Sequence, residues 1–182
     1  PRVEISLEVA IPQFCIGFKM PPSEGLAQLK AEVECELINS ILVGEGSPLY
    51  RELYDSGLVS AGAISSEVLD GRGYFSVLFE GESRDPDQVR QKLWTQLQVL
   101  NQQGIGAEDF ECAKKMLYGQ AVWQFSSVEA LASNLLSAGF DRLSVYDRIE
   151  AIATTSLQDL QNRLLQYQEE HCVLSVVSSV QK

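Results

Sequence analysis

Residues 44 to 59 read Gly44-Glu45-Gly46-Ser47-Pro48-Leu49-Tyr50-Arg51-Glu52-Leu53-Tyr54-Asp55-Ser56-Gly57-Leu58-Val59. The glycines at the start break a long helical pattern, and Ser47 is a typical cap for a new helix. Pro48 then occupies the first helical position, where its missing N–H has no intrahelical partner to lose. Gly57 ends this helix after about two turns, and a strand-like run follows. The segment therefore predicts a junction between a long helix, a short helix and a strand.

Two strands and the long helix precede this junction. Val3 to Ile11 alternates apolar and polar residues, which predicts a half-buried strand, and residues 14–19 predict a more fully buried one. Ser23 is the expected cap of a helix from about Glu24 to Val43, whose apolar residues recur at spacings of three and four.

The chain after the junction predicts a hairpin, then helices, then a last strand. Strands at roughly 59–69 and 73–80 flank the turn Asp70-Gly71-Arg72-Gly73. Helices are expected from Arg84 to before Gly104, and at about 107–125, 128–138, 145–153 and 157–170, with Gly139 closing the third. A strand at 172–180 ends the chain. Because long βαβ alternation is absent, we predict a single α+β domain over residues 1–182, with an antiparallel-rich sheet and helices packed on one face.

Composition narrows the possible partners. The 182 residues are 45% hydrophobic and carry a formal net charge of -11, which is ordinary for a globular protein and argues against nucleic-acid or anionic-membrane partners. No apolar run approaches a membrane span. The four widely spaced cysteines predict reduced, mostly buried thiols in a cytoplasmic protein. The chain begins at Pro1 without a methionine, which is consistent with a domain excised from a longer protein.

The residues offer little catalytic chemistry of their own. His171 is the only histidine, whereas a catalytic zinc needs three protein ligands and a Ser-His-Asp site needs a base beside its nucleophile. The sequence also has no Cys-x-x-Cys pair that could ligate a metal and no glycine-rich loop that could bind a phosphate. We therefore predict no metal or cofactor in this chain and no activated nucleophile, with His171 as an imidazole at a helix end.

Residues 44–59 resemble a stretch of the pitrilysin/insulinase family of zinc metallopeptidases, in which a small-residue turn starts a short helix that ends in Gly-Leu. The order of elements resembles the repeating domain of that family over nearly the whole chain. Those enzymes bind zinc through a His-x-x-Glu-His helix, which this sequence lacks. The resemblance implies the C-terminal, zinc-free domain of such a metallopeptidase, or of an inactive paralogue. Its partner would be a homologous zinc-bearing domain or subunit.

The resemblance also implies a role. In the family two such domains close around an unfolded peptide, so this chain would contribute peptide binding and domain closure and would be inactive alone. The alternative function is a purely structural or assembly domain without a substrate role.

Arg51 and Tyr54 are the predicted substrate-binding residues. In the family an Arg and a Tyr near the Gly-Leu turn bind substrate and stabilise the oxyanion, as donors aimed at developing negative charge can do. Alignment on Gly57 places the Arg position on Tyr54 or Arg51 and the Tyr position on Leu58 or Ser60, so that no alignment recovers both. Arg51 and Tyr54 lie three apart on one helical face. The alternative is that Arg51 pairs with Glu52 or Asp55 and that Tyr54 only packs.

Overall fold

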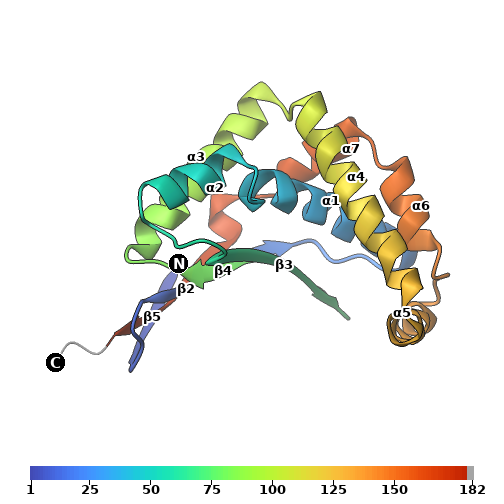
Figure 1. The fold of residues 1–182 in the computed structure, drawn as a ribbon, viewed down its shortest axis with the longest axis horizontal. Coiled ribbons are helices and arrows are strands. Elements are labelled where there is room, and N and C mark those ends of the chain that lie inside the picture. The colour runs from blue at the N-terminus through green and yellow to red at the C-terminus, as the bar shows by residue number, and fades with distance from the viewer. Residues whose placement is uncertain (180–182) are drawn as a thin grey trace.

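The computed structural model describes residues 1–179, which form a five-stranded sheet and a layer of helices (Figure 1). In chain order the elements are β1 (Arg2–Leu7), β2 (Gln13–Met20), α1 (Gly25–Val43), α2 (Pro48–Asp55), β3 (Ile64–Gly71), β4 (Tyr74–Glu82), α3 (Pro86–Gln103), α4 (Ala107–Trp123), α5 (Val128–Asp141), α6 (Asp147–Thr154), α7 (Leu157–Leu164) and β5 (Cys172–Ser179). Short 3₁₀ turns at Gln124–Ser126 and Glu169–His171 follow α4 and precede β5.

The sheet is mostly antiparallel. Its strand order is β1-β5-β2-β4-β3, and only β1 and β5 run parallel. The last strand of the chain therefore lies between the first two. This arrangement confirms the predicted antiparallel-rich α+β fold.

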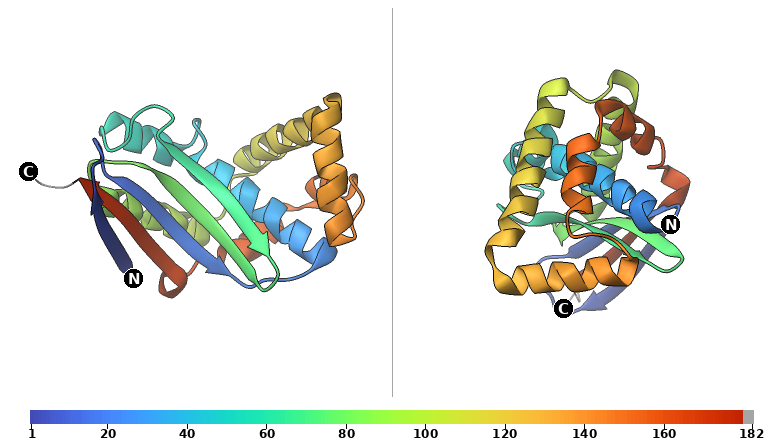
Figure 2. Two further views of the ribbon diagram at one scale, coloured as in Figure 1. Left: turned by 90° about the horizontal axis from the view of Figure 1, so that it is seen from below. Right: turned by 90° about the vertical axis from the view of Figure 1, so that its right-hand side faces the viewer.

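One face of the sheet is covered by helices (Figures 1 and 2). Alternate residues of β2 are buried toward the helices, while Gln13, Cys15 and Lys19 point the other way, as strand geometry requires. α1 lies next to β3, and α2, α3, α4, α6 and α7 pack around it. The core joins both layers and includes Phe18, Phe79, Leu37, Leu53, Leu93 and Leu174. The opposite face of the sheet is left bare, so that the molecule has the outline of an arch with α5 at one foot and β1 and β5 at the other.

Two predicted element starts were wrong. Glu24, not Ser23, occupies the cap position of α1, and Ser23 instead donates its N–H and hydroxyl to Oε1 of Gln28, at 3.0 and 3.2 Å. β3 begins at Ile64 instead of Val59, because residues 60–63 form a turn in which the N–H of Ala63 bonds to the carbonyl of Ser60 at 3.0 Å.

Two predicted helix ends were also wrong. α5 continues past Gly139, because a glycine inside a helix lowers its stability by only about 1 kcal/mol relative to alanine. The helix ends instead at Arg142, which has a left-handed φ of 57°. α7 ends at Leu164, six residues early, because the chain turns and buries the ring of Tyr167 against Phe18. Its hydroxyl donates to Oδ1 of Asn39 at 3.2 Å. The last residue of the predicted final strand, Val180, lies outside the described residues.

Candidate functional site

The short helix α2 is fixed in place at its first turn. Oγ of Ser47 accepts the N–H of Tyr50 at 3.1 Å, and the same hydroxyl donates to the carbonyl of Leu42 at 2.8 Å, so that one side chain joins α1 to α2. The predicted Ser47 cap and the predicted place of Pro48 are confirmed. The hydroxyl oxygen of Tyr50 accepts the N–H of Gly62 at 3.0 Å. This bond ties α2 to the turn before β3.

The end of α2 sets the direction of the segment that follows. Gly57 has a φ of +69°, a conformation in which a side chain would be strained. The N–H groups of Leu58 and Val59 both bond to the carbonyl of Leu53, at 3.0 and 3.3 Å. Val59 is buried, whereas Ser60 is exposed. The chain thus leaves α2 along a fixed path and presents Ser60 to solvent.

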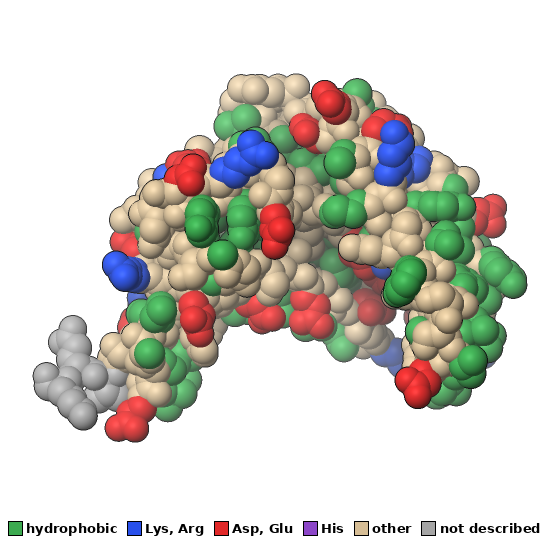
Figure 3. All heavy atoms as spheres, in the orientation of Figure 1, with side chains coloured by type: hydrophobic (Ala, Val, Ile, Leu, Met, Phe, Trp, Pro, Cys, Tyr) green, Lys and Arg blue, Asp and Glu red, His purple; other side chains and the backbone are tan. Residues whose placement is uncertain are grey.

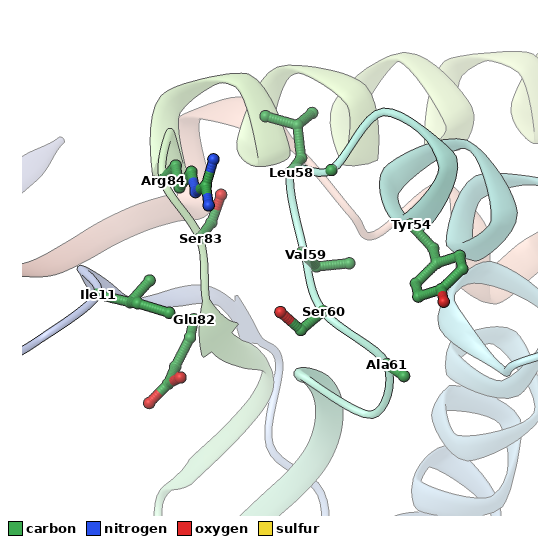
Figure 4. A pocket seen from close by; sticks show the side chains of 10 residues that line it. Ile11, Tyr54, Leu58, Val59, Ser60, Ala61, Glu82, Ser83 and Arg84 are labelled. Atoms are coloured by element: carbon green, nitrogen blue, oxygen red, sulfur yellow. The ribbon is translucent and has the colours of Figure 1, made fainter.

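An open hollow of about 470 Å³ lies beside this path (Figure 4). It is lined by Tyr54, by residues 57–61, by Ile11 and by residues 82–84. In Figure 4, Tyr54 and Arg84 stand on opposite sides, with Ser60 between them. Arg84 follows β4, where buried Ser83 fixes the backbone: its N–H bonds to the carbonyl of Pro12 at 2.9 Å, and its Oγ accepts the N–H of Asp85 at 3.1 Å.

A second hollow of about 570 Å³ continues the first toward the sheet. It shares Ser60, Ala61 and Glu82 with the first hollow and adds, among others, Ser65 and Glu80. We call the two hollows together the groove. The first hollow therefore offers hydroxyl and guanidinium donors together with the carboxylate of Glu82, and the second adds the carboxylate of Glu80.

Gly81 permits the close strand pairing that shapes the groove. A Cβ on this residue would lie 1.9 Å from the carbonyl oxygen of Ala63, so no other residue fits without moving backbone. That carbonyl also accepts the N–H of Glu82, at 3.0 Å. The start of β3 is thereby held against the end of β4.

The structure separates the two predicted site residues. Tyr54 is half-exposed and lines the groove, whereas Arg51 lies on the exposed side of α2, outside the lining residues. Within residues 1–179 Arg51 makes no ion pair, and Glu52 pairs with Lys92 instead. Their roles in binding stay predictions. Sequence reasoning missed Arg84, because Arg84-Asp85-Pro86-Asp87 was interpreted only as the start of a helix.

The described residues hold no arrangement typical of a metal centre. No three His, Cys, Asp or Glu side chains in residues 1–179 come together as a metal would require. His171 ends the 3₁₀ turn before β5, with Nε2 3.9 Å from Oε1 of Glu170. None of the helices within this range is long and apolar enough to cross a membrane.

The cysteines are free thiols, and three of them have perturbed acidity. Burial raises the pKa of Cys35 to about 12, and burial is also the main reason that the pKa values of Cys15 and Cys172 are raised. Because the thiolate is the nucleophilic form, these three groups are poor nucleophiles near neutral pH. Cys35 and Cys172 are buried, whereas Cys15 is half-buried and Cys112 is exposed, so the prediction of mostly buried thiols holds for two of the four.

Comparison with known proteins gives a consistent result. The family profile described as "Peptidase M16 inactive domain" matches residues 1–117. The chain is 27% identical over 161 residues to the uncharacterized zinc protease YmfH of Bacillus subtilis (strain 168), an alignment that covers 87% of this chain and 37% of that protein.

Solved structures share the fold over nearly the whole chain. An M16-like peptidase of Alicyclobacillus acidocaldarius matches with a TM-score of 0.92 at 22% identity, over 98% of this chain and 43% of that one. An inactive peptidase domain from Bordetella parapertussis matches with a TM-score of 0.78 at 17% identity, over 97% and 96%. The chain thus spans less than half of the Bacillus and Alicyclobacillus proteins and almost all of the Bordetella domain.

Proposed function

Because the chain belongs to the family of the peptidase M16 inactive domain, we propose that it acts as the non-catalytic wall of a peptide-binding chamber in a zinc peptidase. The family resemblance predicted from residues 44–59 is confirmed. Zinc and the bond-breaking step would belong to a homologous companion domain, in the same polypeptide or in a separate subunit. This chain would hold the peptide and close onto the companion.

The observation that supports this role best is the groove at the end of α2. Tyr54, Ser60 and Arg84 bring two hydroxyl donors and one guanidinium to a single open hollow. Such donors suit the carbonyl groups of a peptide backbone, and they would suit an oxyanion if the companion brought its reacting carbonyl here. The guanidinium would supply the stronger, charge-assisted bond.

The edge of the sheet offers a second contact to an extended peptide. β3 is an edge strand within residues 1–179, and its neighbour Ala63 and its own Ser65 line the groove. Unpaired backbone groups along such an edge can add a peptide as a further strand. Recognition through the main chain would give a broad substrate range, with Glu80 and Glu82 favouring positively charged side chains at that end of the groove.

A peptide-binding titration tests this proposal. A fluorescently labelled, unstructured peptide of about 20 residues would be titrated with the assembly of this chain and its companion, with the zinc removed so that the peptide stays intact. Arg84→Gln removes a charge-assisted bond worth about 1.5–3 kcal/mol, so we expect Kd to rise about 10- to 100-fold. Tyr54→Phe removes a neutral bond, and we expect a rise of about 2- to 10-fold. Arg51→Ala tests the other residue predicted from the sequence.

Arg72→Gln is the matched control. Arg72 is an exposed arginine at the β3–β4 turn, at the far end of these strands from the groove. It should leave Kd unchanged. If Arg84→Gln and Tyr54→Phe bind the peptide as the unmodified assembly does, the proposal fails and the structural or assembly role stands.

A further inference from the structure

A further hollow lies at the α5 foot of the arch, away from the groove. Its volume is about 250 Å³, and its walls come from α1, from the end of α4 and the 3₁₀ turn that follows, from α5 and from the first turn of α6. Figures 1 and 2 show these helices gathered at this foot. Elements far apart in the sequence thus enclose one small space.

About half of the residues that line this hollow are apolar. Leu29 and Ala121 are buried, and Phe125 and Ile149 are half-buried. The ring of Phe125 is held by Tyr146, which stacks on it with the centroids 5.8 Å apart and the planes at 6°. An apolar cavity of about 150 Å³ accommodates benzene. The hollow therefore has room for one ring with a short chain, on the order of ten non-hydrogen atoms, which is too small for a stretch of peptide.

The charged part of the wall is mainly acidic. Glu32 and Asp141 bring carboxylates from α1 and α5, and neither forms an ion pair within residues 1–179. Arg148 is the one basic residue of the lining in this part of the chain, and its Nη2 lies 2.5 Å from Oε2 of Glu36. The hollow thus holds two carboxylates and a single guanidinium, which a third carboxylate already engages.

Glu32 is affected by this imbalance of charge. Partial burial and the carboxylates of Asp70 and Glu36 raise the pKa of Glu32 to about 7, against the effects of Gln28 and Arg148. A carboxylate taken partly out of water without a cation is unfavourable. A bound ammonium group would offset this and would give Glu32 a charge-assisted hydrogen bond.

An organic cation suits the hollow better than a metal ion. No three His, Cys, Asp or Glu side chains of the described residues come together as a metal would require, and the apolar half of the wall offers a hydrated ion nothing. Acidic side chains gather along the concave underside of the arch (Figure 3), and the net charge of -11 attracts cations to the molecule. An ammonium group carries three N–H donors and no acceptor, which complements carboxylates.

We propose that this hollow binds a small amphipathic amine, whose ammonium group pairs with Glu32 beside Asp141 and whose compact apolar body packs on Leu29, Phe125 and Ile149. The site is separate from the groove and does not depend on the proposed function. Because such a ligand touches α1, α5 and α6 together, its binding would tie the α5 foot to the body of the molecule.

Isothermal titration calorimetry with phenethylamine tests the site on the full chain. We expect saturable binding with a Kd of about 1 mM or tighter at pH 8, as contacts of about ten non-hydrogen atoms allow. Phenethyl alcohol has nearly the same shape but no charge, and it should bind at least about tenfold more weakly. Phenylacetate carries a carboxylate and should not bind.

Three variants locate the bound amine. Glu32→Gln removes a charge-assisted hydrogen bond and should weaken phenethylamine binding about 10- to 100-fold at pH 8. Ala138→Leu fills part of the hollow and should weaken it at least about tenfold. Glu150→Gln is the matched control, because Glu150 is exposed on α6 and lies outside the lining, so Kd should not change. Circular dichroism checks that all three variants fold.

The pH dependence distinguishes an ion pair from simple packing. With a pKa of about 7, Glu32 must release its proton before it pairs with the ammonium, so binding should be about tenfold weaker at pH 6 than at pH 8. The other charged groups around it, which are Asp70 on β3, Glu36 on α1, Asp141 on α5 and Arg148 on α6, are retained in Glu32→Gln. That variant should therefore show the same Kd at both pH values.

Three results would overturn the proposal. Phenethyl alcohol that binds as tightly as phenethylamine would show an apolar cavity without selectivity for cations. Unchanged affinity in both Glu32→Gln and Ala138→Leu would place the amine elsewhere. The absence of saturable binding up to about 10 mM phenethylamine would show that the hollow takes no ligand of this class.

Discussion

Replacing Glu32 with glutamine should make the protein less sensitive to pH. Glu32 lies on α1 and lines a hollow of about 250 Å³ between α1, α4, α5 and α6. Partial burial and the nearby carboxylates of Asp70 and Glu36 raise the pKa of Glu32 from 4.5 to about 7, against the opposing effects of Gln28 and Arg148. Asp141 and Arg148 are the other charged residues that line this hollow within the described part of the chain.

The direction of the effect follows from proton binding. Between pH 4.5 and about 7 the folded chain keeps a proton on Glu32 that the unfolded chain has released. The folded state therefore loses stability as the pH rises through this window, and the contribution of Glu32 is most favourable at or below pH 4.5. At about 1.36 kcal/mol per pH unit, the difference sets an upper bound of about 3.4 kcal/mol. Because the carboxyl group remains partly open to solvent, screening reduces this, and we expect about 1–2 kcal/mol.

Urea unfolding, followed by circular dichroism between pH 4.5 and 8, measures this difference. Glu32→Gln keeps the shape of a neutral carboxyl group, so it should match the unmodified chain within about 0.5 kcal/mol near pH 4.5 and exceed it by about 1–2 kcal/mol at pH 8. Glu45→Gln, at an exposed residue before α2, is the control, and its stability difference should be the same throughout. A Glu32→Gln difference that does not grow between pH 4.5 and 8 would refute the reasoning.

Two further predictions concern the chain on its own. Nε of Arg163 lies 2.8 Å from Oε2 of Glu34, and their side chains are only 16% and 7% exposed. Arg163→Leu should lower the free energy of unfolding by about 3–5 kcal/mol, because it leaves a buried carboxylate unpaired. A loss below about 1 kcal/mol in urea unfolding would contradict this. The isolated chain should retain no stoichiometric zinc after dialysis against a chelator and should not cleave unstructured peptides, because it has too few metal-ligating side chains. Elemental analysis measures the zinc, and a peptidase assay measures the cleavage. Zinc that survives the chelator would reveal a missed site.

Local patterns in the sequence predicted most of the fold, because they depend on neighbours along the chain. Ser47 caps α2 with its own side chain, and Pro48 and Gly57 act through their own backbone geometry, so both ends of α2 were predicted correctly. The errors arose where contacts between residues far apart in the sequence determine where a helix or strand begins or ends. α7 stops because Tyr167 is buried against Phe18, a contact across almost the whole chain that helical spacing does not reveal.

The groove was only half predictable for the same reason. Tyr54 belongs to a segment with a recognisable pattern, whereas Arg84 reaches the groove only because β4 ends beside the turn that precedes β3. Nothing in the run around Arg84 distinguishes it from any arginine before a helix. Likewise, the apolar residues of α5 predicted a helix correctly, but only the fold shows that Ala130, Leu131, Asn134 and Ala138 face the body of the molecule while Val128, Leu136 and Phe140 are exposed.

The position of β5 between β1 and β2 has a consequence for synthesis on the ribosome. β1 is the first strand of this domain to leave the exit tunnel, yet within the described sheet it pairs only with β5, the last strand of the domain. Pairing across about 170 residues brings a large loop-closure entropy and is slow. While the rest of this domain is synthesised, Val3, Ile5 and Leu7 thus have no strand to pair with, and β1 is the segment of the nascent domain most in need of a chaperone.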